Sequence, residues 1–125
     1  MARILLVDDE ETIRDLLKTV LTFAHHDVEV ASDGQEALRV FVEAPSPFDL
    51  IITDMIMPEA DGFRLVEEIA IRDPNAKIII MSGWFDEDEL KITQSTVSRT
   101  IRGIIRKPST MEKIQSLLNQ VLEED

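Results

Sequence analysis

Short runs of consecutive apolar residues alternate along this chain with longer stretches in which apolar residues recur every three or four positions. The runs at residues 4–7, 50–52 and 78–81 are wholly apolar. This is typical of parallel strands that helices cover on both faces. The runs at residues 28–30 and 103–106 mix apolar and polar residues, which suits the edges of a sheet. The pattern predicts a parallel sheet with the mixed runs outermost.

The stretches between these runs have the period of amphipathic helices. The two clearest stripes are Ile13, Leu16, Leu17, Val20 and Leu21, and Ile114, Leu117, Leu118, Val121 and Leu122. Each stripe is expected to be buried along its length. Weaker helical patterns cover residues 34–44, 61–72 and, least clearly, 87–98. The alternation predicts one α/β domain over residues 1–125, with a doubly wound, flavodoxin-like sheet of five parallel strands in the order 2-1-3-4-5 and helices on both faces.

Composition narrows the classes of function. A length of 125 residues with 44% hydrophobic content fits a soluble domain with one core. The net charge of −12 argues against direct binding to nucleic acid or to an anionic membrane. The absence of cysteine excludes disulfides and thiolate metal sites and fits a cytoplasmic protein. The first apolar run is too short for a secretory or membrane-spanning segment.

Two local features stand out against this acidic background. Residues 92–111 contain no acidic residue, although Arg99, Arg102, Arg106 and Lys107 all lie within them. A solvated face is favoured there over a docking patch for an acidic partner. The adjacent pair His25-His26, after the first helical stripe, is expected in a solvent-facing turn.

Charged residues stand where three of the apolar runs end. Asp8 and Asp9 follow the first run, Asp54 comes shortly after the third, and Lys107 shortly after the fifth. The carboxyl ends of parallel strands share one edge of a sheet, where ligands of such folds bind. Three acids gathered there would repel one another unless a cation lay among them. Oxygen ligands alone favour Mg²⁺, which also bridges readily to phosphate. The sequence therefore predicts a site that handles a phosphoryl group on Mg²⁺.

Four motifs follow one another at the expected strand ends. They are Asp8-Asp9, Asp54 with Met57-Pro58 and Asp61-Gly62 after it, Met81-Ser82-Gly83, and Lys107-Pro108. This ordered set resembles the receiver domain of two-component response regulators, and the similarity covers essentially the whole chain. The resemblance implies a signalling protein rather than an enzyme. Its Asp54 would accept a phosphoryl group from a phosphohistidine and thereby switch the binding of a partner.

The resemblance also implies a role for each site residue. Asp9 and Asp54 would be direct ligands of Mg²⁺ together with the backbone carbonyl of Ile56, while Asp8 would act through a metal-bound water. The hydroxyl of Ser82 and the ammonium of Lys107 would each contact a phosphoryl oxygen and assist phosphorylation and dephosphorylation.

The partners implied are a sensor histidine kinase or a histidine phosphotransfer protein as donor, and a downstream protein or a missing output domain as target. The family often associates through the face of its fourth and fifth helices. Arg99, Arg102 and Arg106 make that face the first candidate for a partner site.

Three residues before Lys107, the family usually has an aromatic residue that reports phosphorylation. Ile104 stands at that position, so no aromatic switch is expected here.

Other classes of function fit less well. A phosphatase of the haloacid dehalogenase type needs a second Asp two positions after its nucleophile, where this chain has Ile56. A nucleotide- or flavin-binding domain would place phosphate on the first strand-to-helix turn, but residues 8–11 are all acidic and would repel a phosphate without a metal. A receiver-like interaction module that is not phosphorylated remains the alternative, although such a module has no need of Asp54 or Lys107.

Overall fold

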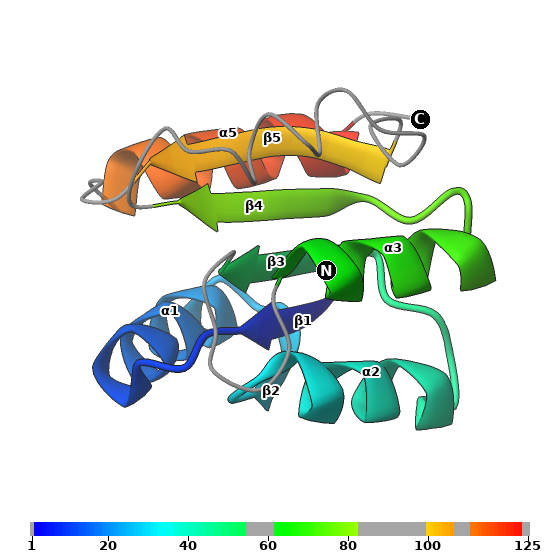
Figure 1. Cartoon of the computed structure of the whole chain (residues 1–125). Helices are drawn as coiled ribbons and strands as arrows, with labels where there is room; N and C mark the ends of the chain where they lie inside the picture. Colours follow the sequence, from blue (N-terminus) through cyan, green and yellow to red (C-terminus); the bar gives the residue numbers. More distant parts are fainter. Residues whose placement is uncertain (1, 55–61, 83–99, 107–110, 124–125) are drawn as a thin grey trace.

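The computed structural model describes residues 2–54, 62–82, 100–106 and 111–123. Its five parallel strands form one sheet in the order β2-β1-β3-β4-β5, which confirms the predicted topology (Figure 1). The strands are β1 (Arg3–Val7), β2 (Asp27–Ala31), β3 (Leu50–Asp54), β4 (Ile78–Ser82) and β5 (Ile101–Arg106). The helices are α1 (Glu11–Phe23), α2 (Gly34–Glu43), α3 (Gly62–Arg72) and α5 (Met111–Glu123). The helix expected over residues 87–98 lies outside the described residues.

Each face of the sheet has its own apolar core, so the domain has two cores where its length and composition suggested one. The reason is that successive side chains of a strand point to opposite faces. In β1, Ile4 and Leu6 belong to the core under α1 and α5. Leu5 and Val7 belong to the core under α2 and α3. Figure 1 shows these two helix pairs on opposite sides of the sheet. The central strands are continuously apolar because helices cover both of their faces.

The edge strands are less regular than the central ones. In β2 the valines Val28 and Val30 are half-buried and Glu29 between them is exposed, as the alternating sequence predicted. At the other edge, the pairing of β4 with β5 shifts between Ile78 and Ile79, so Arg102 is an extra residue in a bulge.

A close approach of α5 to β5 depends on a glycine. A Cβ atom added to Gly103 would lie 2.9 Å from the Cδ1 and Cδ2 atoms of Leu117 in α5. This distance is shorter than van der Waals contact, so a larger residue at position 103 would force the Leu117 side chain to move. The glycine therefore lets the helix lie close to the strand.

The buried stripe of α1 is narrower than the sequence predicted. Leu17 and Leu21 are buried, and Ile13 and Val20 are half-buried. Leu16 has 50% of its surface exposed, so the expectation that it packs into the core is wrong. Neighbouring residues of a helix differ by about 100° in direction, and Leu16 falls at the outer margin of the stripe centred on Leu17 and Leu21. The stripe of α5 is confirmed: Ile114, Leu118 and Val121 are buried, while Leu117 and Leu122 pack against them.

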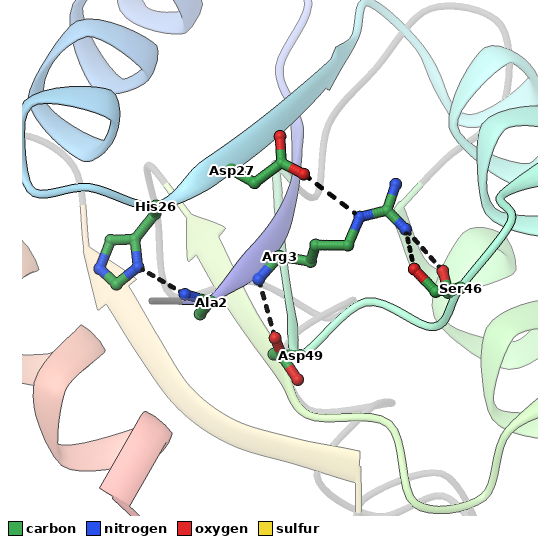
Figure 2. Close-up of polar contacts among 6 residues, drawn as sticks. All are labelled: Ala2, Arg3, His26, Asp27, Ser46 and Asp49. Atoms are coloured by element: carbon green, nitrogen blue, oxygen red, sulfur yellow. Dashed lines mark hydrogen bonds and ion pairs between the residues drawn. The ribbon is translucent and has the colours of Figure 1, made fainter.

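Arg3 joins several segments at the amino-terminal end of the sheet (Figure 2). Its backbone N–H donates to Oδ2 of Asp49 at 2.8 Å, and its Nη1 donates to both the carbonyl and the hydroxyl of Ser46 at 2.7 Å. Its Nε lies 3.6 Å from Oδ2 of Asp27. The guanidinium carbon lies 4.6 Å from the centre of the Phe48 ring, a cation–π contact. One side chain thus links β1 to β2 and to the segment that leads into β3.

His26 joins the same region, contrary to the expectation for this pair. His25 is exposed, as expected, and has a φ of 69°. His26 is instead half-buried, and its Nδ1 accepts a hydrogen bond of 3.1 Å from the backbone N–H of Ala2 (Figure 2). Burial, followed by the charges of the amino terminus and of His25, lowers the pKa of His26 from 6.5.

None of the helices among residues 2–54, 62–82 and 111–123 is long and apolar enough to cross a membrane.

Replacing the Arg3 guanidinium tests its structural contribution. Arg3→Met keeps the alkyl stem but removes the contacts to Ser46 and Asp27, so the free energy of unfolding should fall by about 1–2 kcal/mol in urea titrations. Arg39→Met is the matched control, because Arg39 and Glu43 form only an exposed pair 3.8 Å apart. The control should lose less than about 0.5 kcal/mol. Equal losses in the two variants would contradict a special role for Arg3.

The lowered pKa of His26 predicts acid sensitivity. The unfolded chain binds a proton at its ordinary pKa of 6.5, whereas the folded chain binds it only at lower pH. Protons therefore favour unfolding, so this contribution to stability is complete above pH 6.5 and declines as the pH falls below it. His26→Asn offers an oxygen near the place of Nδ1 and does not titrate. Urea unfolding between about pH 7 and 5 should show a smaller loss of stability for this variant than for the wild type. If the free energy of unfolding changed with pH equally in the variant and the wild type, His26 would not contribute to the acid sensitivity.

Candidate functional site

Three of the residues predicted for the site meet at the carboxyl ends of β1 and β3. Asp8 and Asp9 follow β1, and Asp54 is the last residue of β3. The parallel register pairs Val7 with Thr53, which brings Asp8 beside Asp54. This edge of the sheet is marked by the arrowheads of β1 and β3 in Figure 1.

A fourth acid, Glu10, joins them. One carboxylate oxygen from each of Asp8, Asp9, Glu10 and Asp54 lies within 4.8 Å of the others. Sequence reasoning missed Glu10 as a site residue, because it considered residues 8–11 only as an acidic turn that would repel phosphate. Its position directly after Asp9 and before the first helix was the available signal.

The four carboxylates differ in exposure. Asp8 is 0% exposed and Asp54 is 6% exposed, whereas Asp9 and Glu10 are exposed. Two acids of the cluster are therefore buried and two are exposed to solvent. Anionic groups this close repel one another most strongly where water is excluded. The arrangement favours a bound cation that reduces this repulsion.

The backbone around Asp8 is held from several sides. Its N–H donates to the carbonyl of Ala31 at 3.2 Å, and its carbonyl accepts from Nη1 of Arg14 at 2.9 Å. Its own Oδ1 accepts a 2.9 Å hydrogen bond from the backbone N–H of Glu10. At the neighbouring strand end, the Thr53 hydroxyl donates to the carbonyl of Asp54 at 3.0 Å. These contacts fix the turn that carries the acids.

Of the other predicted site residues, Ser82 is described in its backbone only. Ser82 ends β4, which pairs with β3 through Met81 and Asp54, so its backbone lies at the same edge of the sheet. Its side chain, together with all of Ile56 and Lys107, lies outside the described residues.

The residues of the candidate partner face are also described only in part. Arg102 is half-buried in the β5 bulge, and the backbone of Arg106 ends the strand. The side chain of Arg106 and the whole of Arg99 lie outside the described residues.

The donor set fits a hard divalent cation. Every group of the cluster offers a carboxylate oxygen, the ligand type that Mg²⁺ and Ca²⁺ prefer. Two oxygens bound to one octahedral Mg²⁺ lie about 2.9 Å apart when adjacent and about 4.1 Å apart when opposite, given Mg–O distances of about 2.0–2.1 Å. The 4.8 Å limit within the cluster is therefore close to what one ion requires. Waters that Mg²⁺ retains can bridge the remaining gap.

Comparison with known proteins assigns this arrangement to a family. The sequence profile of the response regulator receiver domain matches residues 4–119. The chain belongs to this family. Receiver domains are signalling modules of two-component systems that interact with histidine kinases and output domains, and phosphorylation and Mg²⁺ binding are typical of them.

The relatives with similar sequences include a chemotaxis protein, a sensor kinase and response regulators. The chemotaxis protein CheY of Thermotoga maritima is 32% identical over 120 residues, which are 95% of this chain and 96% of that protein. The sensor kinase CckA of Brucella abortus is 28% identical over 122 residues, 98% of this chain. The chain spans only 13% to 21% of the length of this kinase and of two Arabidopsis thaliana response regulators.

A solved receiver structure agrees in fold. The response regulator TrrA of Thermotoga maritima, in complex with Mg²⁺-BeF, has a TM-score of 0.80 and is 29% identical. The match covers 97% of this chain and 99% of TrrA.

Repulsion within the cluster predicts a stabilising substitution. Asp54→Asn removes one charge, so in EDTA its melting temperature should exceed that of the wild type by about 2–6 °C, and saturating Mg²⁺ should narrow the gap. Asp15→Asn, an exposed acid of α1 outside the cluster, should change the melting temperature little. An Asp54→Asn protein that melts below the wild type in EDTA would contradict this account.

Proposed function

We propose that residues 1–125 form one receiver domain in which Asp54 accepts a phosphoryl group from a phosphohistidine. The observation that carries the proposal is the position of Asp54, at the end of a central strand and within 4.8 Å of three other carboxylates. In the proposed transfer, a carboxylate oxygen of Asp54 attacks phosphorus and the bond between phosphorus and the histidine nitrogen breaks. The bonding electron pair remains on that nitrogen, and an aspartyl phosphate forms.

A bound Mg²⁺ would neutralise charge on the phosphoryl oxygens, which otherwise oppose attack by an anion. Asp9 and Asp54 would hold the ion together with the backbone carbonyl of Ile56. The buried carboxylate of Asp8 would orient a metal-bound water. The structural support for this division is that Asp8 is fixed by its backbone contacts and lies deepest in the cluster.

Two further residues would act on the transferred group. Lys107 would place a positive charge against one phosphoryl oxygen, and the Ser82 hydroxyl would donate a hydrogen bond to another. The position of the Ser82 backbone at the same sheet edge as Asp54 supports this role. Drawing Ser82 toward the phosphoryl group would shift the segment after β4 and so alter partner binding.

The donor in this proposal is a sensor histidine kinase or a histidine phosphotransfer protein. The target is a downstream protein or an output domain, bound through the face that includes Arg99, Arg102 and Arg106. The chain matches 13% of the sensor kinase CckA and 96% of the chemotaxis protein CheY, so a long and a short chain are both compatible with this role.

The direct test is the intact mass after incubation with acetyl phosphate and Mg²⁺. The wild type and Asp15→Asn should gain one phosphoryl group, whereas Asp54→Asn, or the wild type in EDTA, should gain none, because acceptor or cation is missing. A gain by Asp54→Asn would place the acceptor elsewhere. No gain by the wild type, from acetyl phosphate or from a phosphorylated histidine phosphotransfer protein, would favour an interaction module that is not phosphorylated.

A further inference from the structure

Glu10 occupies an unusual place at the start of α1. It is the N-cap residue of the helix, a position where short polar side chains normally accept hydrogen bonds from the first helical N–H groups. The Glu10 side chain makes no such capping hydrogen bond. Its carboxylate is instead one of the four whose oxygens gather within 4.8 Å.

The negative charge of Glu10 adds to that of the other acids in the cluster. The acids predicted for the metal site, Asp8, Asp9 and Asp54, already carry three negative charges against the two positive charges of Mg²⁺. A fourth carboxylate at this distance adds attraction for a cation, and its oxygen can bind the ion or one of its waters. Because Glu10 is exposed, its carboxylate is accessible to a cation that arrives from solvent.

We propose that Glu10 is an additional cation-binding residue of this site, which raises its affinity for Mg²⁺ before any phosphoryl donor arrives. The inference rests on the proposed function, since it concerns the same metal site. It goes further because it gives Glu10 a role in binding Mg²⁺ to the site. Asp9 and Glu10 are the exposed members of the cluster, and Asp8 and Asp54 are its buried members.

A simpler explanation of Glu10 is that its charge stabilises the positive end of the α1 dipole. Glu11 provides the control for that explanation. It is the next residue, it is exposed, it lies in the first turn of the same helix, and it is not part of the cluster. Substituting Gln at either position changes the net charge equally and leaves the side-chain shape nearly intact.

The experiment is calorimetric titration of Mg²⁺ into the metal-free protein without a phosphoryl donor. Glu10→Gln should weaken Mg²⁺ binding roughly tenfold, in line with the effect of losing a residue that supports a metal. The Mg²⁺ affinity of Glu11→Gln should stay within about twofold of that of the wild type, because solvent screens the charge of Glu11. Glu10→Asp keeps the charge and should bind more tightly than Glu10→Gln. Thermal unfolding in EDTA checks that each variant is folded.

The outcomes separate the two proposals. Equal Mg²⁺ affinities for Glu10→Gln and Glu11→Gln would overturn the role of Glu10 and leave the receiver function intact, provided that Asp54 is still phosphorylated. An Mg²⁺ affinity of Glu10→Asp no better than that of Glu10→Gln would also count against a role for the charge. Absence of Mg²⁺ binding by the wild type would overturn both the role of Glu10 and the metal dependence of the proposed function.

Discussion

Repulsion among carboxylates at the ends of β1 and β3 is the constraint around which the site is organised. Two of these groups, Asp8 and Asp54, are buried, and buried anions are costly unless a cation or hydrogen-bond donors compensate them. The turn after β1 is held by backbone hydrogen bonds and by Arg14, so it cannot easily move its acids apart. Binding a cation among these carboxylates reduces the repulsion, so the geometry of the cluster favours metal binding.

The sheet supplies the stability that permits this arrangement. The strands β1, β3 and β4 are almost fully buried, and their side chains divide between two separate cores. Burial of apolar surface contributes about 25 cal/mol per Å², so such strands can hold an unfavourable cluster at their ends. The parallel register then determines which strand ends are adjacent. The acids lie close together because the chain places β1 beside β3, with helices packed on both faces.

Much of this could be predicted from the sequence, for reasons that particular residues make clear. Continuous apolar runs identified the central strands, and the acids close to the ends of those runs identified Asp8, Asp9 and Asp54. Glu10 was missed because the direction of a turn side chain depends on backbone geometry that local pattern does not encode. Leu16 and His26 were misjudged for a related reason. The edge of a buried stripe and the packing of a turn depend on which segments lie beside them, and those contacts form only in the folded chain.

The Arg3 contacts lie at the opposite end of β1 from the acids. They join the start of that strand to β2 and to the segment before β3, so the first residues of the sheet are firmly placed. Residues 3–7 in extended form separate the two ends by about 3.3 Å per residue. A protein immobilised through its amino-terminal end would therefore present the acidic cluster away from the support. Binding of ions or partner proteins could then be measured on a surface without the attachment covering the site.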